Sequence, residues 1–516
     1  MNNLANYYKK IDKRTLSNFC LLVVLAVAFA IRYGGIKFGF PLITHPDEPL
    51  IAGSATNIII TKDLNPHMFI YPSLYIYMQA LDYIFIFSIG KLIGIFHSFF
   101  DIGVTTFYFW GRMLTIILSV WTIYFVYLLA NLLFNRLVGV ISTLFIAFSL
   151  LHVSNSYTIT TDSPMAFLII LSFFVSAVNY INGPKLRYYI LNGALIGCAV
   201  STKYTAVWCV LPLIYVHLHH TSFSRVKLLD RKLLLGLLSI PAAFVLTSPF
   251  SILAFNDFAH SLALDRKAYS LGHFGFESDA VSYGYYFGSL VGKYGIIPLI
   301  FAGIGVIFSL IRDFRKTALL LSFPIPYFIF LGAYKVHFDR NMVCLVPYLA
   351  LMSGYGIFEL TECFKNAARN KIVKCALYFL LIISVVSGVY AQSHKVLDYN
   401  RLITLPDTRS ISKLWIEENI PTGARIAREH YTPPVDNKTF KVNDLGYYGL
   451  IKASLDSYDY IIASSSDYNR FLNDEKRYPV QSKKYKEIFS KYELVKEFVP
   501  DNIKVGGPRI SIYKIR

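Results

Sequence analysis

Long apolar segments recur along this 516-residue chain up to about residue 391. A helix that crosses a lipid bilayer needs about 20 predominantly apolar residues. Charged residues make up only 16% of the chain, against about 25% in ordinary soluble domains. The sequence therefore predicts a polytopic α-helical membrane protein. The candidate membrane segments lie at residues 21–31, 74–96, 113–134, 137–151, 165–181, 188–200, 206–218, 233–250, 295–311, 318–331, 342–360 and 375–390.

Basic residues between these segments predict how the chain is oriented. Lys9, Lys10, Lys13 and Arg14 precede the first segment, which places the N-terminus in the cytoplasm, because positively charged loops stay on that side. The loops at 185–187, 225–232, 312–316 and 365–374 are basic as well and are expected there too. The last segment follows a basic loop, so the C-terminus should lie outside the cytoplasm. We expect about 11–13 transmembrane helices.

The net charge of +18 does not indicate a nucleic-acid-binding protein, because the basic residues are spread over short loops between apolar segments. Anionic lipid headgroups or a phosphorylated lipid substrate are the expected partners, and no nucleic acid is expected. The six cysteines are scattered, mostly within apolar segments, and lack the paired spacing of a zinc site or a disulfide framework. We expect the protein in the plasma (inner) membrane.

The composition divides the chain into two domains. Residues 1–391 form the expected membrane domain, with outward loops at 33–73 and 251–288, and residues 392–516 form an expected soluble, non-cytoplasmic α/β domain. Within the second domain, residues 413–419 have an amphipathic helical pattern that stops before Pro421 and Gly423. Residues 460–463 and 510–513 have the pattern of strands.

The strongest local signal is the segment Thr44-His45-Pro46-Asp47-Glu48, directly beyond the first apolar segment. Adjacent carboxylates close to a membrane boundary are costly unless they are solvated or used. A solvated turn started by Pro46 is the alternative interpretation. The loop continues through further Pro, His and aromatic residues to Tyr71-Pro72, and a loop of this length more often covers a functional site than simply links two helices.

This order of motifs resembles the GT-C glycosyltransferases, in particular the protein O-mannosyltransferase and aminoarabinose lipid A transferase group. The resemblance rests on the Asp-Glu pair, on an aromatic-Pro-x-Leu start of the second apolar segment, and on later motifs in the same order. One position departs from the aminoarabinose transferases, which have Lys before the Pro where this chain has Tyr71. The later motifs are Thr160-Thr161-Asp162-Ser163, Ser201-Thr202-Lys203-Tyr204, His337-Phe338-Asp339-Arg340-Asn341 with Pro347, and Asp407-Thr408-Arg409 with Trp415 and Pro421.

The resemblance implies an inverting transfer of a monosaccharide from a polyprenyl-phosphate donor to a glycan, lipid or protein acceptor at the outer face of the membrane. It makes Asp47 the expected general base, with Glu48 orienting it or contacting acceptor or sugar. Arg340 and Lys203, supported by His337, are the expected cations for the donor phosphate. For both cations a structural role is the alternative, which for Arg340 is that of an interfacial side chain reaching toward water.

A weaker set of candidate substrate-binding residues comprises His45, Tyr71, Asp162, Arg266 and Lys267. Asp162 fits a helix N-cap equally well, since Asp before a helix accepts backbone N–H bonds. Arg266 and Lys267 lie in the 251–288 loop, which suits a lid over a sugar or lipid headgroup and also suits an amphipathic surface helix. No metal site is expected and no cofactor is required, although the carboxylates leave a divalent cation possible.

Two other functions remain open at this point. A glycan ligase or oligosaccharyltransferase would use a lipid-pyrophosphate donor, and enzymes of this kind that attack an amide generally need a divalent cation. A lipid or solute transporter would use the membrane charges as an ion relay, and repeat symmetry between two halves would be expected. We find no such symmetry in the sequence.

Overall fold

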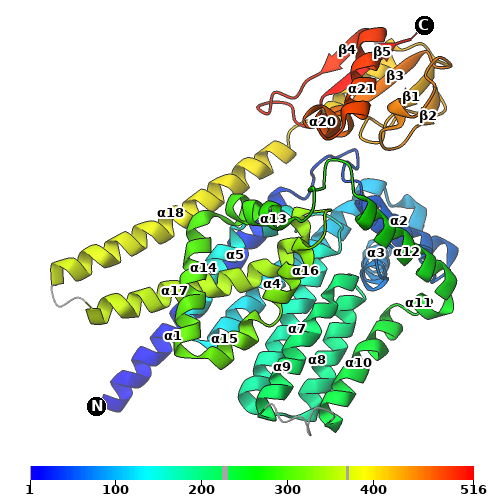
Figure 1. Cartoon of the computed structure of the whole chain (residues 1–516). Coiled ribbons are helices and arrows are strands. Elements are labelled where there is room, and N and C mark those ends of the chain that lie inside the picture. Colours follow the sequence, from blue (N-terminus) through cyan, green and yellow to red (C-terminus); the bar gives the residue numbers. More distant parts are fainter. Residues whose placement is uncertain (1, 223–229, 368–370, 516) are drawn as a thin grey trace. The chain divides into compact units, whose positions relative to one another are not determined.

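The computed structural model describes residues 2–222, 230–367 and 371–515, and the chain forms two compact units. Unit 1 comprises residues 1–36, 46–272 and 278–397, and unit 2 comprises residues 37–45, 273–277 and 398–516. Figure 1 colours the chain along its sequence, so the three passages through unit 2 can be followed. The basic loops predicted at 225–232 and 365–374 lie partly outside the described residues.

Unit 1 is built from helices and short helical turns. In its described residues the short turns are η1 (Phe99–Asp101), η2 (Tyr204–Cys209), η4 (Leu290–Tyr294) and η5 (Asp339–Leu345). Its helices are α1 (Asn2–Gly34), α2 (Glu48–Thr61), α3 (Leu74–Leu92), α4 (Val104–Leu133), α5 (Arg136–Ala147), α6 (Leu150–Ser154), α7 (Asp162–Asn182), α8 (Leu186–Val200), α9 (Val210–His220), α10 (Arg231–Thr247), α11 (Phe250–Leu253), α12 (Phe255–Leu271), α13 (Tyr283–Ser289), α14 (Ile296–Arg312), α15 (Phe314–Leu321), α16 (Pro324–Gly332), α17 (Val346–Ala367) and α18 (Lys371–Ile403).

Glycines let several of these helices approach closely. A Cβ at Gly193 of α8 would collide with the carbonyl oxygen of Gly236 on α10. A Cβ at Gly305 of α14 would collide in the same way with the carbonyl oxygen of Met352 on α17. Small residues at such crossings are typical of helix packing in membranes, where close backbone contact replaces the hydrophobic effect.

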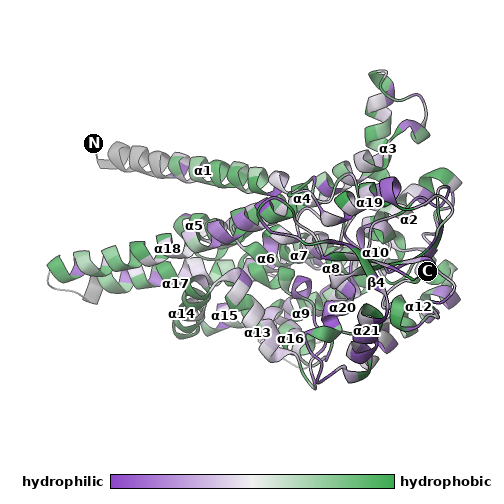
Figure 2. Ribbon diagram, turned by 90° about the horizontal axis from the view of Figure 1, so that it is seen from above, coloured by the Kyte–Doolittle hydropathy of each residue, from purple (hydrophilic) through white to green (hydrophobic). Residues whose placement is uncertain are grey.

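The polytopic helical fold class predicted from the sequence is confirmed. In the described part of the chain, five helices are long and apolar enough to cross a membrane, or up to seven if each of two bent pairs is one span. Figure 2 shows hydrophobic residues, in green, along much of the α18 ribbon. The prediction of 11–13 spans exceeds this number because several predicted segments form shorter helices, such as α5, α8 and α9, with 12, 15 and 11 residues. The number of spans stays a prediction.

The two predicted outward loops contain helices. The 33–73 loop contains α2, which begins one residue after Asp47. The 251–288 loop contains most of α11 and the whole of α12. Residues 255–271 form the helix α12, and a role in substrate binding stays a prediction.

Unit 2 is an α/β unit, as predicted. Its five-stranded sheet has the order β2-β1-β3-β5-β4. The strands β1 and β2, and β1 and β3, pair in parallel, whereas β3 with β5 and β4 with β5 are antiparallel. Its elements are α19 (Thr408–Asn419), β1 (Arg425–Arg428), β2 (Lys441–Asp444), η6 (Gly449–Ile451), β3 (Tyr460–Ser464), α20 (Ser465–Leu472), α21 (Pro479–Lys491), β4 (Glu493–Phe498) and β5 (Ile510–Lys514).

Alternating side chains of the central strands build a core on each face of this sheet. On β3, Ile461 belongs to the cluster that includes Phe471 and Tyr485 from α20 and α21. The next residue, Ile462, belongs to the opposite cluster with Ile416 of α19. This two-residue period is expected for a sheet covered on both faces. The helix predicted at 413–419 and the strands predicted at 460–463 and 510–513 are confirmed within α19, β3 and β5.

The boundary between the predicted domains falls inside a helix. The composition changes near residue 391, but α18 continues unbroken to Ile403, and unit 2 takes over at Asp398. Unit 2 also includes residues 37–45 and 273–277, which the sequence assigned to the membrane domain. A change in composition therefore locates this boundary only approximately, because a helix can run from an apolar into a polar environment.

Candidate functional site

Asp47 forms an ion pair with Arg340, a residue 293 positions later in the chain. Asp47 occupies the N-cap position of α2 without a side-chain capping bond, and Arg340 lies in the short turn η5 that precedes α17. Their side chains are 19% and 25% exposed. The pair is thus sheltered but accessible, as a reacting group must be.

Asp162 lies on the other side of Arg340. It is the first residue of α7 and its side chain is buried. Its Oδ2 atom is 4.0 Å from the Nε atom of Arg340, and its Oδ1 atom is 2.6 Å from the Nζ atom of Lys203. Arg340 therefore interacts with two carboxylates that come from different parts of unit 1.

Lys203 completes this arrangement. It lies at the break between α8 and η2, where the chain leaves regular helix, and its side chain is 13% exposed. Besides Asp162, its Nζ atom donates to the side-chain oxygen of Asn341 at 2.8 Å. We call Asp47, Asp162, Lys203, Arg340 and Asn341 the charged cluster. It combines two carboxylates and two permanent cations, so its formal charge is balanced.

Tyr71 and His337 flank the charged cluster. Tyr71 interacts electrostatically with Arg340. His337 lies three residues before Arg340 but is turned toward α13, where its Nδ1 atom is 3.2 Å from the hydroxyl of Ser282 and its ring lies 3.7 Å from that of Tyr285. The structure thus gives His337 partners of its own in the wall beside the cluster.

Glu48 is placed apart from the charged cluster, although it is the neighbour of Asp47. Its carboxylate is fully buried and accepts two hydrogen bonds from Arg112 of α4, at 2.8 and 2.7 Å. It also accepts the backbone N–H of Ile159 at 3.0 Å, while Arg112 donates to the carbonyl of Ile36 at 2.8 Å. These contacts give Glu48 a structural role in joining α2 to α4.

The remaining predicted residues lie elsewhere. Arg266 and Lys267 are exposed on α12, and among the described residues no hydrogen bond or ion pair links them to the charged cluster. His45 is partly buried and belongs to unit 2. No role for these three residues follows from the geometry.

Sequence reasoning missed two contributors. Asn341 stands in the quoted His337–Asn341 motif but was not assigned a role, and only the fold brings it to Lys203. Arg112 opens an apolar segment, and a charge at that position is a signal for a paired or functional residue in membrane proteins. That signal could have predicted a buried partner for one of the two adjacent carboxylates.

The charged cluster has the components needed to bind a phosphate. A guanidinium offers a planar, two-pronged donor surface and an ammonium offers a point charge. Within the described residues, no group of three or more His, Cys, Asp or Glu side chains is placed to hold a metal ion. Asp47 and Asp162 are instead engaged by cations of the protein itself. Such a site can bind an anionic leaving group and leave one carboxylate free to accept a proton.

The chain resembles one known family and several solved structures. Residues 93–252 match the family described as dolichyl-phosphate-mannose-protein mannosyltransferase. The archaeal oligosaccharyltransferase from Archaeoglobus fulgidus superposes with a TM-score of 0.59 at 14% identity, over 96% of this chain and 74% of that one. ArnT from Cupriavidus metallidurans, bound to undecaprenyl phosphate, superposes with a TM-score of 0.54 at 13% identity, over 96% and 98%. No curated protein matches in sequence.

These findings identify the fold of the chain. The chain has the fold of the GT-C membrane glycosyltransferases, and the family match falls within the part of unit 1 that carries Asp162 and Lys203. The resemblance to this class that the order of motifs indicated is confirmed.

Proposed function

We propose that this protein transfers a single sugar from a polyprenyl-phosphate donor to an acceptor at the non-cytoplasmic face of the membrane. The observation that carries this proposal is the charged cluster, in which Asp47, Asp162, Lys203 and Arg340 converge from four distant segments. The likeness to a structure that holds undecaprenyl phosphate supports a polyprenyl-phosphate donor.

In the proposed reaction, an acceptor oxygen attacks the anomeric carbon of the sugar. The new bond from acceptor oxygen to carbon forms as the bond between that carbon and the phosphate oxygen breaks, and the phosphate leaves with the electron pair as polyprenyl phosphate. Asp47 takes the proton from the acceptor, which is the role of a general base. A single displacement of this kind inverts the anomeric centre.

Arg340 connects donor binding to the activation of Asp47. Its guanidinium pairs with Asp47. A donor phosphate competes for the same guanidinium, because charge-assisted hydrogen bonds to phosphate are strong and directional. As Arg340 turns toward the phosphate, the Asp47 carboxylate can accept the proton of the acceptor.

Lys203 supplies the second cation in this scheme. Asp162 and Asn341 hold its ammonium group at 2.6 and 2.8 Å, and this fixes the flexible side chain in one place. Asp162 is therefore proposed as a positioning residue for Lys203 and Arg340. Preorganised charges of this kind stabilise the leaving phosphate in the transition state.

An oligosaccharyltransferase-type reaction is the second candidate, because the fold also matches the archaeal enzyme. The transfer of a single sugar from a polyprenyl-phosphate donor is favoured because both carboxylates of the charged cluster pair with Arg340 or Lys203. In the monosaccharide transfer, Arg340 and Lys203 would neutralise the charge of the leaving phosphate. In amide glycosylation a divalent cation generally has this function.

A donor panel tests the proposal. Purified protein in nanodiscs is incubated with radiolabelled polyprenyl-phosphate monosaccharides, with and without EDTA. Asp47→Asn is compared with Asp63→Asn, because Asp63 is 49% exposed in the same 33–73 loop and forms an ion pair with the exposed His67. We expect one donor to release polyprenyl phosphate in wild type and Asp63→Asn, with EDTA present, and not in Asp47→Asn.

Other results would point to the alternatives. Transfer that needs both a pyrophosphate-linked glycan and a divalent cation would replace the proposal with the oligosaccharyltransferase reading. Movement of lipid or solute in vesicles, without consumption of any donor and lost in Asp47→Asn, would favour a transporter.

A further inference from the structure

The strand order of unit 2 creates a position where ligands commonly bind. The parallel strands β1 and β3 are neighbours, but the chain leaves β1 toward β2 on one side and leaves β3 toward β5 and β4 on the other. In open α/β sheets, ligands bind beyond the carboxyl ends of the strands at such a switch point. Here Tyr431 follows β1 and Ser465 follows β3.

A cavity of about 550 Å³ opens at this switch point. Its volume is within the range of about 300–1,000 Å³ that small-molecule sites occupy. It is lined by Tyr431, by Ser465 and Ser466 at the start of α20, and by the exposed amides Asn469 and Asn473. The wall therefore combines an aromatic ring with several groups that can both donate and accept hydrogen bonds.

Residues 273–277 form the opposite wall, and unit 2 holds them firmly. The N–H of Gly275 donates to the hydroxyl of Tyr478 at 3.1 Å, and this hydroxyl donates to the Glu277 carboxylate at 2.8 Å. Arg477 donates to the carbonyl of Glu277 at 2.6 Å. Gly275 has a φ of +79°, and a Cβ there would lie 2.9 Å from the Arg470 side chain, so glycine is required at this position.

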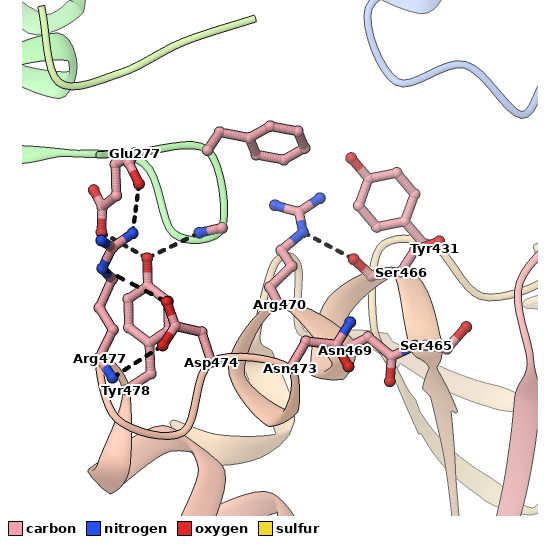
Figure 3. Close-up of a pocket in the computed structure, with 12 residues that line it drawn as sticks. Glu277, Tyr431, Ser465, Ser466, Asn469, Arg470, Asn473, Asp474, Arg477 and Tyr478 are labelled. Carbon is pink, nitrogen blue, oxygen red and sulfur yellow. Dashed lines mark hydrogen bonds and ion pairs between the residues drawn. The ribbon is translucent and has the colours of Figure 1, made fainter. Parts of the chain in front are cut away.

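Arg470 lies between the two walls (Figure 3). Its guanidinium is 4.9 Å from the ring centre of Phe276 and 5.3 Å from that of Tyr431. It donates to the carbonyl of Ser466 at 2.8 Å and to the hydroxyl of Tyr448 at 2.5 Å. Among the described residues, no carboxylate lies within 4.0 Å of this guanidinium. The aromatic rings thus hold a cation that also interacts electrostatically with the buried Asp467.

We propose that this cavity binds a saccharide, with Arg470, Asn469 and Asn473 donating to its oxygens and the rings of Phe276 and Tyr431 contacting its apolar face. This assignment rests on the proposed sugar transfer, in which the saccharide is the acceptor. Planar amides and a guanidinium match the paired hydroxyls of a sugar ring. The same guanidinium can also bind a carboxylate or phosphate substituent on the sugar. Neutral and acidic saccharides therefore share the chemistry that this cavity recognises, which is a ring rich in oxygen atoms.

The location of the cavity agrees with a binding role and not with catalysis. Its two acidic residues, Glu277 and Asp474, are engaged by Tyr478 and by Arg477, respectively, with 3.7 Å between the Nε atom of Arg477 and Asp474. These pairs fix the rim of the cavity and leave the central cation and the amides to the ligand. In recognition sites, a few precisely placed polar groups typically contact the ligand.

Hydrogen exchange measured on the full-length protein without any donor tests the proposal. The probes are methyl glucoside, methyl mannoside and N-acetylglucosamine as neutral sugars, and glucuronic acid and glucose 6-phosphate as acidic ones. We expect at least one probe to slow exchange in residues 273–277 and 465–478. Binding confined to the acidic probes would assign Arg470 to the charged substituent, and equal binding of neutral sugars would assign it to ring hydroxyls.

Three variants locate the binding. Asn469→Ala removes one exposed amide and should weaken binding about tenfold, because a hydrogen bond to the ligand is lost. Asn469→Trp should abolish binding by filling the cavity, whereas Asn437→Ala, an exposed amide elsewhere in unit 2, should bind like wild type. Protection that persists in Asn469→Trp, or no protection with any probe, would overturn the proposal.

The same measurement separates this proposal from the proposed function. Asp47→Asn should bind the saccharide as wild type does, because the cavity lies within unit 2 and Asp47 within unit 1. Saccharide binding without consumption of any lipid donor would keep the cavity and reject the transferase. Donor consumption without saccharide binding would keep the transferase and reject the cavity.

Discussion

Asp47 and Glu48 are adjacent in the chain, yet their carboxylates bind different arginines. Asp47 pairs with Arg340 in a partly exposed setting, whereas Glu48 is fully buried against Arg112. Consecutive residues at the start of a helix point about 100° apart. The first turn of α2 therefore directs one carboxylate toward the accessible cluster and the other into the protein interior.

Breaking the buried pair should destabilise unit 1. Glu48→Gln removes the carboxylate that neutralises the buried guanidinium of Arg112, which costs about 3–5 kcal/mol. The double variant Glu48→Leu with Arg112→Met removes both charges and should recover much of this loss. Thermal unfolding in detergent measures both effects. A Glu48→Gln protein as stable as wild type but unable to transfer sugar would instead assign Glu48 to the chemistry.

Removing the ammonium of Lys203 should weaken donor binding. Lys203→Met loses a charge-assisted interaction with the donor phosphate, worth about 1.5–3 kcal/mol, so the KM for donor should rise about 10- to 100-fold. Steady-state kinetics with the donor that the panel identifies measures this change in KM. Lys185 is exposed, and Lys185→Met is the matched control that should keep the wild-type KM. A fall in kcat with an unchanged KM would show that Lys203 acts only in the transition state.

The residues of the charged cluster could be singled out from the sequence, but their contacts could not. Short motifs around Asp47, Asp162, Lys203 and Arg340 follow a recognisable order, and each motif breaks an apolar pattern, so each is visible locally. The pairing of Glu48 with Arg112 is not visible, because 64 residues separate them and either carboxylate of the Asp-Glu pair could have taken the arginine. Which one does so depends on the rotation of α2.

Unit 2 should become less stable as the pH rises from about 4.5 to about 8. Burial, together with the nearby Asp467, raises the pKa of Glu429 to about 8. Between the ordinary pKa of 4.5 and this value, the folded state holds a proton that the unfolded state has lost. The free energy of unfolding therefore falls, by up to about 1.4 kcal/mol per pH unit, and levels off above pH 8.

Trp415 offers a reporter for this effect, since its ring packs against Phe498 within unit 2. Urea unfolding followed by its fluorescence, in a variant whose other tryptophans are phenylalanine, gives the stability at each pH. Glu429→Gln should flatten the pH profile between 5 and 8, whereas the exposed Glu418→Gln should not. A wild-type profile that rises with pH would contradict a raised pKa at Glu429.

Phe274 should contribute to the stability of unit 2 although it lies far from the rest of that unit in sequence. Its ring centre is 5.4 Å from that of Phe471 and 5.6 Å from those of Tyr448 and Tyr478. Phe274→Ala should lower the unfolding free energy by about 1–3 kcal/mol, because it removes three aromatic contacts from a residue that is 38% exposed. The Trp415 assay measures this loss, and the half-exposed Val499→Ala should show almost none.

The packing of Phe274 into unit 2 could not have been predicted from the sequence. Its neighbours in the chain suggested a lid on the membrane domain, and only contacts with residues about 170 to 200 positions later assign it to unit 2. By contrast, the strands β3 and β5 and the helix α19 were predictable, because their alternating or helical patterns are local.

Because the chain passes through unit 2 three times, this unit is not a module that can be moved as one piece of sequence. A fragment starting at residue 398 would lack one wall of its cavity and would leave the ring faces of Tyr448, Phe471 and Tyr478 uncovered. A single proteolytic cut after α18 would not release it either. Chimeras that exchange the C-terminal region between related enzymes would need to transplant residues 273–277 along with it.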